Sequence, residues 1–184
     1  MLRIIAGDYG RRVIKAPAGQ RTRPTSDRVR ESLFGTLTRL ADLDGATFLD
    51  LYAGSGAIGL EALSRGADRA VFVDSGADAI GVIRENVRSL GVAARCRIES
   101  SAVQSFLART ASLAADVVFL DPPYTLPVDA DLGLLASRGW LAPDALVIAE
   151  RGTRTPDPVW PAGLALEESR TYGETKLWYA RYEG

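Results

Sequence analysis

The pattern of apolar and polar positions changes twice along the chain. Between residues 46 and 149, short apolar runs alternate with stretches whose apolar positions recur at helical spacing. The apolar runs predict strands at 46–52, 69–74, 95–99, 117–120 and 145–149. The stretches between them predict helices at 57–65, 78–90, 103–109 and 132–138. Because strands that alternate with helices pair in parallel and are covered on both faces, this region is expected to form an α/β sheet.

Both ends of the chain depart from this alternation. Residues 165–172 and 176–182 flank Gly173-Glu174-Thr175 and predict a C-terminal antiparallel β-hairpin. At the other end, residues 2–6 and 12–16 surround a turn and predict a small N-terminal hairpin.

A loop rich in proline and arginine, at 17–24, leads into a helix. Thr25 or Ser26 can cap this helix, which we expect to run to about Leu40. One of its faces repeats apolar residues at helical spacing: Val29, Leu33, Leu37 and Leu40. We therefore expect a small hairpin and basic loop, residues 1–24, in front of a main domain of residues 25–184.

Composition restricts the chemistry that the chain can perform. It has 184 residues, 47% of them hydrophobic, which suits one soluble domain with a buried core. Histidine is absent, which excludes Ser-His-Asp triads and metal sites that need imidazole. The single cysteine, Cys96, cannot form an internal disulfide, and no apolar run is long enough to span a bilayer. We expect a cytoplasmic protein without a bound metal.

Charge is distributed unevenly along the chain. Residues 1–40 carry nine basic and three acidic side chains, a net charge of +6, whereas the remainder sums to −7. A basic segment on an acidic body favours a polyanionic partner, although a solvated arm without a partner gives the same pattern. The candidate phosphate contacts are Arg11, Arg12, Lys15, Arg21, Arg23, Arg28 and Arg30. For Arg28 and Arg30, ion pairing with the acidic surface is the alternative.

The first expected strand of the main domain runs into a glycine-rich turn. Asp50 precedes the motif Gly54-x-Gly56-x-x-Gly59, whose glycines allow a sharp turn and let a ligand approach the backbone closely. Asp74 ends the next strand, where a carboxylate can accept both hydroxyls of a ribose. Asp50 would repel a pyrophosphate and suits a cationic ligand, which favours S-adenosylmethionine over a dinucleotide.

The strand expected at 117–120 continues into Asp121-Pro122-Pro123-Tyr124. The two prolines stiffen this loop, which would aim the Asp121 carboxylate and the Pro122 carbonyl at one place. Both groups are acceptors and match the two N–H donors of an exocyclic amine. Held in this way, the nitrogen becomes pyramidal with a free lone pair, while Tyr124 can stack on the base. The loop predicts methyl transfer to an exocyclic amine of a nucleic-acid base, with Asp121, Pro122 and Tyr124 as catalytic residues.

Together with these two motifs, three further segments give a narrower resemblance. Residues 3–7, 21–34 and 59–66 resemble the bacterial RsmD family, and the resemblance covers nearly the whole chain. Members of that family are 16S ribosomal RNA guanine-N2 methyltransferases that act on the small subunit. The resemblance implies a Rossmann-like, seven-stranded, mostly parallel sheet that ends in the antiparallel hairpin. It also implies S-adenosylmethionine as the donor, S-adenosylhomocysteine as the product, and an N-terminal extension that engages 16S rRNA within the 30S subunit; we expect a monomer.

The resemblance also assigns a cofactor site. Asp50, Gly54 and Gly56 would line the methionine end, and Asp74 the ribose. Ser101-Ala102 falls where related enzymes often place an acidic or amide residue against the adenine amine, and a serine there can still accept a hydrogen bond. The full set of implied contacts is Asp50, Tyr52, Ala53, Gly54, Ser55, Gly56, Asp74, Ser75, Ser101, Ala102 and Asp121.

Three other functions share part of these features. The Asp-Pro-Pro-Tyr motif serves adenine or cytosine in DNA equally well, although the chain has no long insertion for target recognition. The glycine motif with Asp74 also fits an NAD-dependent oxidoreductase, but no clear acid for hydride transfer is visible. The basic arm alone fits an RNA-binding module with a vestigial cofactor pocket.

Overall fold

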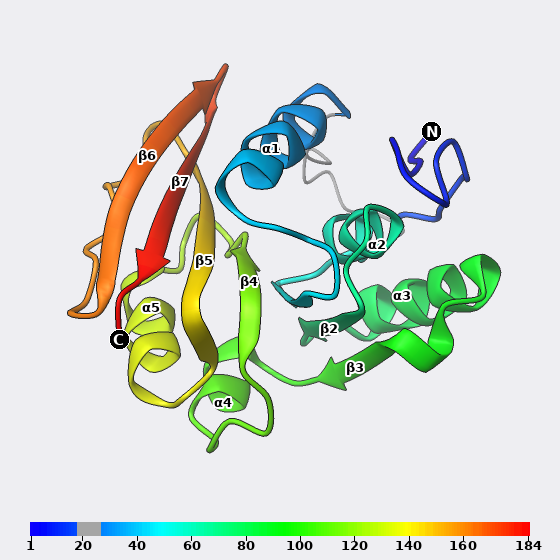
Figure 1. The fold of residues 1–184 in the computed structure, drawn as a ribbon. Coiled ribbons are helices and arrows are strands. Elements are labelled where there is room, and N and C mark those ends of the chain that lie inside the picture. The colour runs from blue at the N-terminus through cyan, green and yellow to red at the C-terminus, as the bar shows by residue number, and fades with distance from the viewer. Residues whose placement is uncertain (18–26) are drawn as a thin grey trace.

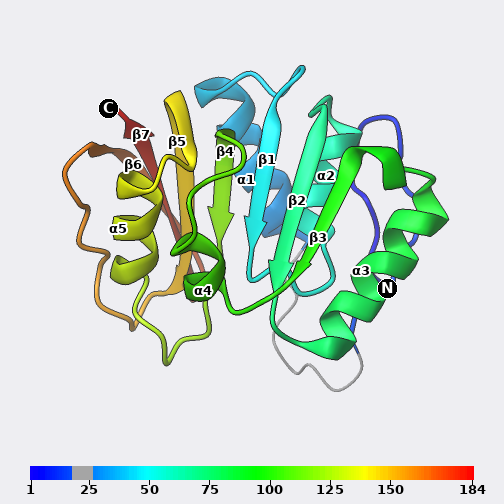
Figure 2. The ribbon, with the colours of Figure 1, turned by 90° about the horizontal axis from the view of Figure 1, so that it is seen from below.

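The computed structural model describes residues 1–17 and 27–184. Its centre is a seven-stranded sheet with the order β3-β2-β1-β4-β5-β7-β6 (Figures 1 and 2). Strands β1 to β5 pair in parallel, and β7 pairs antiparallel with both β5 and β6. The strands are β1 (Thr47–Leu51), β2 (Arg69–Asp74), β3 (Cys96–Ser100), β4 (Ala115–Leu120), β5 (Leu141–Gly152), β6 (Leu164–Tyr172) and β7 (Thr175–Tyr182).

Helices cover both faces of this sheet. Figure 2 shows α4 and α5 on one side of the strands and α1 and α2 on the other. The predicted Rossmann-like α/β sheet with a C-terminal hairpin is therefore confirmed. The helices are α1 (Asp27–Leu40), α2 (Ala57–Ser64), α3 (Ala77–Leu90), α4 (Val103–Leu107) and α5 (Asp129–Ser137), with a 3-10 turn at Ala93–Arg95.

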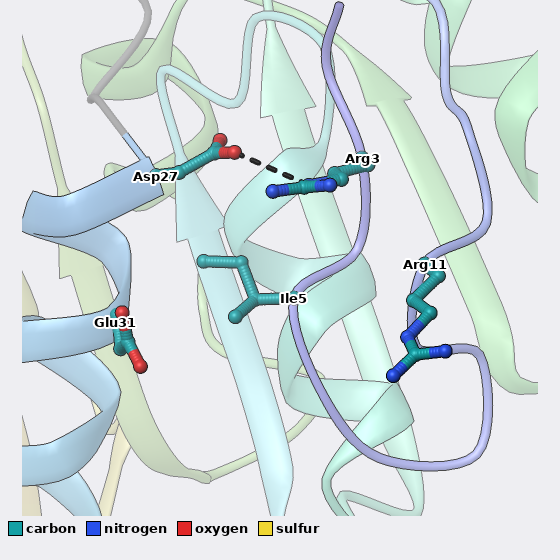
Figure 3. Close-up of a pocket in the computed structure, with 5 residues that line it drawn as sticks. All are labelled: Arg3, Ile5, Arg11, Asp27 and Glu31. Atoms are coloured by element: carbon teal, nitrogen blue, oxygen red, sulfur yellow. Dashed lines mark ion pairs between the residues drawn. The ribbon is translucent and has the colours of Figure 1, made fainter.

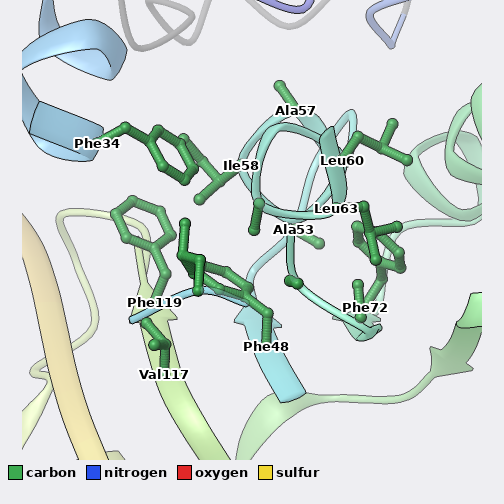
Figure 4. Packing of buried hydrophobic residues seen from close by; sticks show 14 of the residues in the cluster. Phe34, Phe48, Ala53, Ala57, Ile58, Leu60, Leu63, Phe72, Val117 and Phe119 are labelled. Atoms are coloured by element: carbon green, nitrogen blue, oxygen red, sulfur yellow. The ribbon is translucent and has the colours of Figure 1, made fainter. Parts of the chain in front are cut away.

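Two hydrophobic clusters, one on each face, hold the layers together. On the face of α2, phenylalanines from α1 and three strands surround the helix (Figure 4), and all are buried: Phe34, Phe48, Phe72 and Phe119. On the opposite face, Phe106 of α4 packs on Trp140 with ring centroids 4.5 Å apart. Because the central strands are apolar on both faces, burying them requires helices on both sides, as the sequence pattern predicted.

Strand β5 is much longer than the expected 145–149. It extends to Gly152, and its last residues pair with β7, including Arg151 with Lys176. Polar residues at this end are kept in the strand by the antiparallel partner, which the local sequence does not reveal. As a result, β5 carries Arg151 past the last paired residue of β4, into the region of the loop that follows β4.

The N-terminal arm, residues 1–17, is a looser hairpin than predicted, with one isolated antiparallel bridge between Arg3 and Val13. It is anchored to α2. The buried Glu61 carboxylate accepts the backbone N–H groups of Ile5 and Ala6 at 2.7 and 3.1 Å. These bonds satisfy two backbone N–H groups that would pair with the opposite strand in a complete β-hairpin. The arm is therefore fixed to the helix that follows the glycine loop.

Two expectations about the N-terminal region keep their status as predictions. The basic loop and the cap at Thr25 or Ser26 lie outside the described residues, and so does the boundary between residues 24 and 25. Within the described part of the chain, no helix has both the length and the apolar character needed to cross a membrane.

Candidate active site

The order of the strands creates one position where a ligand is expected. From β1 the chain moves outward through β2 to β3 and then returns to β4 on the other side of β1. Ligands of open α/β sheets bind beside the carboxyl ends of the strands at such a switch point. Leu51, the last residue of β1, pairs with Val73 of β2 and Leu120 of β4. The residues that follow these three strands therefore lie around one edge.

The glycine loop after β1 is held by Asp74 at the end of β2. Gly54 and Gly56 both have positive φ, 57° and 76°, a conformation that favours glycine. The Asp74 carboxylate accepts the Gly54 N–H at 2.9 Å through one oxygen and the Gly76 N–H at 2.8 Å through the other. Each oxygen keeps a further lone pair, which is available to a hydroxyl of a ribose.

Asp50 lies below the same loop with only 1% of its surface exposed. One of its oxygens accepts the Gly59 N–H at 2.9 Å, near the start of α2. Burial raises the pKa of this carboxyl well above its ordinary value, the Gly59 hydrogen bond opposes the rise, and the nearby charges of Asp74 and Asp121 add to it.

Asp121 directly follows β4 and completes the acidic group. Burial raises its pKa to about 6, and the positive charge of Arg151 opposes this rise. Its backbone N–H lies 3.4 Å from the Leu51 carbonyl oxygen, which joins it to the end of β1.

Asp50, Asp74 and Asp121 form an acidic cluster at the switch point. A cationic ligand would relieve their mutual repulsion, whereas a pyrophosphate would increase it. The cluster thus fits the ammonium and sulfonium of S-adenosylmethionine better than it fits a dinucleotide. Within residues 1–17 and 27–184, no group of three or more His, Cys, Asp or Glu side chains is arranged to hold a metal ion.

The loop after Asp121 is held from β5. Arg151, only 5% exposed, donates to the carbonyl oxygens of Pro122 and Pro123 at 3.2 and 3.3 Å through one nitrogen. Its other terminal nitrogen lies 3.3 Å from the Tyr124 carbonyl oxygen. Sequence reasoning missed Arg151, because the expected strand ended at residue 149 and nothing else distinguishes this arginine from the other cations.

The Tyr124 side chain is 67% exposed at the mouth of the site. Its ring lies close to Gly152, where an added Cβ would come within 3.0 Å of the Tyr124 Cε1 atom. An exposed aromatic ring that is held from one side can offer its other face to a base.

A second contact missed from the sequence joins the glycine loop to α5. The Tyr52 hydroxyl donates to Asp131 at 2.7 Å, and Asp131 is fully buried in the first turn of α5. Tyr52 has a φ of 62°, which is unusual for a residue with a side chain. The hydrogen bond to Asp131 therefore anchors the side chain of a residue whose backbone is strained. Burial and the Asp131 hydrogen bond raise the pKa of the Tyr52 hydroxyl above its ordinary value.

The remaining predicted cofactor residues lie at the same edge of the sheet. The Ala53 N–H donates to the Val73 carbonyl at 3.1 Å, and the Ser101 N–H donates to the Asp74 carbonyl at 3.0 Å. Ser75 and Ala102 are exposed. The Ser55 carbonyl accepts a hydrogen bond from the buried Asn86 of α3 at 3.0 Å.

Asn86 also connects this loop to the N-terminal arm. Its side chain exchanges two hydrogen bonds with the Lys15 backbone, at 2.8 and 2.9 Å. The Lys15 ammonium pairs with Glu85 of α3 at 2.8 Å, and Arg12 donates to the Ser89 carbonyl at 2.9 Å. The side chains of Arg11 and Arg28 are exposed, as a phosphate contact requires.

Arg30 does not fit its predicted role as a phosphate contact. It is 1% exposed, and one of its nitrogens donates to the Arg3 carbonyl at 2.8 Å and to Asp27 at 2.7 Å. Arg30 therefore forms an ion pair with an acidic residue, which was the alternative to a phosphate contact. Arg21 and Arg23 lie outside the described residues.

The surface beside Arg30 is also less basic than the sequence suggests. A hollow of about 200 Å³ between the arm and α1 is lined by two cations, two anions and Ile5, and Arg3 pairs with Asp27 at 3.4 Å (Figure 3). The hydrogen bond from Arg30 and the nearby charge of Arg3 lower the pKa of Asp27, which keeps this carboxylate ionised. Because its two cations and two anions balance, this hollow offers a phosphate no net positive charge.

The sheet order, the glycine loop and the Asp-Pro-Pro-Tyr loop are those of a Rossmann-like, S-adenosylmethionine-dependent methyltransferase. Residues 2–181 match the family model described as conserved hypothetical protein 95, and the chain belongs to this family, which is the RsmD family of the predicted resemblance.

Two curated relatives and one solved structure show how close the similarity is. The chain is 36% identical to ribosomal RNA small subunit methyltransferase D of Escherichia coli K12, over 94% of this chain and 86% of that protein. It is 34% identical to the putative rRNA methyltransferase YlbH of Bacillus subtilis, over 95% of each. The structure of the putative methyltransferase yhhF from Escherichia coli superposes with a TM-score of 0.89 at 33% identity, covering 99% of this chain and 98% of that one.

The contact between α2 and β2 predicts that Gly59 tolerates no side chain. An alanine Cβ there would lie 2.4 Å from Cε1 of Phe72 and 3.2 Å from Oδ2 of Asp50. We expect Gly59→Ala to destabilise the protein by about 1–3 kcal/mol, because the helix must move away from the sheet. The movement also breaks the Asp50 hydrogen bond, so S-adenosylhomocysteine should bind more weakly in calorimetry.

Gly81 of α3 provides the matched control, because an added Cβ there meets nothing within 4 Å. In urea unfolding, Gly81→Ala should stabilise the protein by about 0.5–1 kcal/mol, since alanine favours a helix interior. Equal stability of the two variants would contradict the close packing assigned to Gly59.

Proposed function

We propose that this protein transfers a methyl group from S-adenosylmethionine to the N2 amine of a guanine in 16S rRNA of the small ribosomal subunit. The observation that carries the proposal is the half-buried Asp121 carboxylate at the start of a proline-stiffened loop, near the buried Asp50. The family and the names of the relatives support RNA as the substrate class.

The acidic cluster and the glycine loop would hold the cofactor. The Asp50 side of the loop suits the methionine ammonium, and Asp74 suits the ribose hydroxyls. Ser101 lies beside Asp74 and would approach the adenine. When bound, S-adenosylmethionine supplies a methyl group that its sulfonium has already activated, so the chain's own residues need only position the acceptor.

The Asp121 loop would position the acceptor nitrogen. The Asp121 carboxylate accepts one N–H of the amine and the Pro122 carbonyl accepts the other, which frees the nitrogen lone pair. The exposed Tyr124 ring stacks on the base once the base has left its helix. Alkylation makes the nitrogen strongly acidic, so the Asp121 carboxylate that already accepts its N–H can take the proton.

The test offers radiolabelled S-adenosylmethionine to unmethylated small subunits, naked 16S rRNA and duplex DNA, followed by nucleoside analysis. We expect label in N2-methylguanosine from a ribosomal substrate. Asp121→Ala should retain binding of S-adenosylhomocysteine and lose transfer by at least about 100-fold, because alanine offers no acceptor for the N–H of the amine. Label in methyladenine or methylcytosine from DNA would instead establish the DNA amino-methyltransferase alternative.

The same assay has a predicted pH dependence. Asp121 must be ionised to accept an N–H, and its pKa is raised to about 6. The value of kcat/KM, which reports groups of the free protein, should therefore fall as the pH drops through about 6, because the ionised form is lost below that value. A kcat/KM that stays constant down to about pH 5 would contradict the role of Asp121.

The N-terminal arm should contribute phosphate contacts. Neutralising Arg11, Arg12, Arg21 and Arg23 together should weaken RNA binding and flatten its salt dependence, by about 0.7 in log–log slope for each phosphate that the variant no longer neutralises. Filter binding across a salt series measures this slope. The control is Arg138→Gln, which changes an exposed cation at the end of α5. If the fourfold variant and the control give the same slope, the arm does not contact RNA phosphates.

A further inference from the structure

Arg151 is a buried cation that nothing in the methyltransferase reaction itself requires. It lies at the end of β5, where pairing with Lys176 of β7 keeps its backbone in the sheet. Only 5% of Arg151 is exposed, although an arginine is seldom buried without a partner. The groups that Arg151 contacts should therefore explain why it is buried.

Three consecutive carbonyls accept hydrogen bonds from this guanidinium. The oxygens of Pro122, Pro123 and Tyr124 lie 3.2 to 3.3 Å from its two terminal nitrogens. A planar guanidinium can hold several acceptors at once in a fixed arrangement, which a lysine ammonium on its flexible stem cannot match.

The sequence of the loop explains why it needs an external donor. Pro122 and Pro123 have no N–H, so these two residues can be fixed through their backbone only by their carbonyls. The Pro123 carbonyl also accepts the Leu126 N–H at 2.9 Å, whereas the donor to the Pro122 carbonyl is Arg151. Since the Pro122 carbonyl has two lone pairs, one can accept from Arg151 while the other accepts from the substrate amine.

Arg151 also acts on Asp121 through its charge. Burial raises the pKa of Asp121 and Arg151 opposes that rise. Asp50 of β1 also lies near enough for its charge to interact with that of Asp121, and Asp50 is an anion when ionised. Within the described residues, Arg151 is the cation identified as favouring the ionised form of Asp121.

We propose that Arg151 is a positioning residue, which holds the loop from Asp121 to Tyr124 in the geometry that accepts an amine. The inference rests on the proposed function, because it assigns the acceptor site to this loop. Arg151 would touch neither the cofactor nor the reacting nitrogen, and would act through the carbonyls and the carboxylate of the loop.

The experiment compares Arg151→Lys and Arg151→Met with Arg154→Met. Arg154 is the matched control, because it lies three residues further on with 91% of its side chain exposed and pairs only weakly with Glu174 at 3.5 Å. In each variant we would measure kcat and KM for the RNA, binding of S-adenosylhomocysteine, and the titration of the Asp121 carboxyl by carbon NMR, assigned with Asp121→Asn.

Arg151→Lys should bind S-adenosylhomocysteine within about threefold of the wild type and lose about 10- to 100-fold in kcat, because a small displacement of the acceptor groups has this effect. Its Asp121 should still titrate near pH 6, since the positive charge remains. In Arg151→Met the Asp121 titration should move to higher pH. Arg154→Met should match the wild type throughout.

Two results would overturn the proposal: wild-type kcat in Arg151→Lys, or an unchanged Asp121 titration in Arg151→Met. If Arg151→Met does not fold, Arg151→Lys alone decides through the split between kcat and cofactor binding. If the wild type methylates no RNA, the proposed function fails, while the NMR titration of Asp121 still decides whether Arg151 controls this carboxyl.

Discussion

The crowding of three carboxylates at one edge of the sheet is the constraint on which the rest of this site depends. Asp50 lies in β1, and Asp74 and Asp121 lie at the carboxyl ends of the neighbouring strands β2 and β4. Burial raises the pKa of Asp50 and of Asp121 and so disfavours their charge. Backbone N–H groups of the glycine loop and of α2 offset part of this cost, and Arg151 offsets more at Asp121. The remaining excess of negative charge gives the site its preference for a cationic ligand.

These same carboxylates organise the backbone around them. Asp74 fixes the glycine loop to the end of β2, and Asp50 fixes the start of α2 below it. Because α2 also carries Glu61, which holds the N-terminal arm, the arm and the glycine loop share one helix as their support. The arm, for which RNA binding is proposed, and the cofactor site therefore pack against the same helix.

The sheet and the positions of Asp50, Asp74 and Asp121 could be predicted because they follow from local patterns. Continuous apolar runs identify strands that are buried on both faces, and parallel pairing then brings their carboxyl ends together. The contacts of Arg30, Arg151 and the Tyr52–Asp131 pair could not be predicted, because each joins elements or side chains that only the tertiary fold brings together. Arg30 shows this most clearly, since a helix pattern gives no sign that its guanidinium turns inward to Asp27.

The most direct test of the acidic cluster is calorimetry of S-adenosylhomocysteine binding near pH 6, in two buffers with different enthalpies of ionisation. The ligand's ammonium should lower the pKa of Asp121, which burial raises to about 6 in the free protein, so binding near pH 6 should release protons, and NAD should not compete. Binding without proton release, or competition by NAD at similar affinity, would contradict the conclusion that the acidic cluster selects a cationic cofactor.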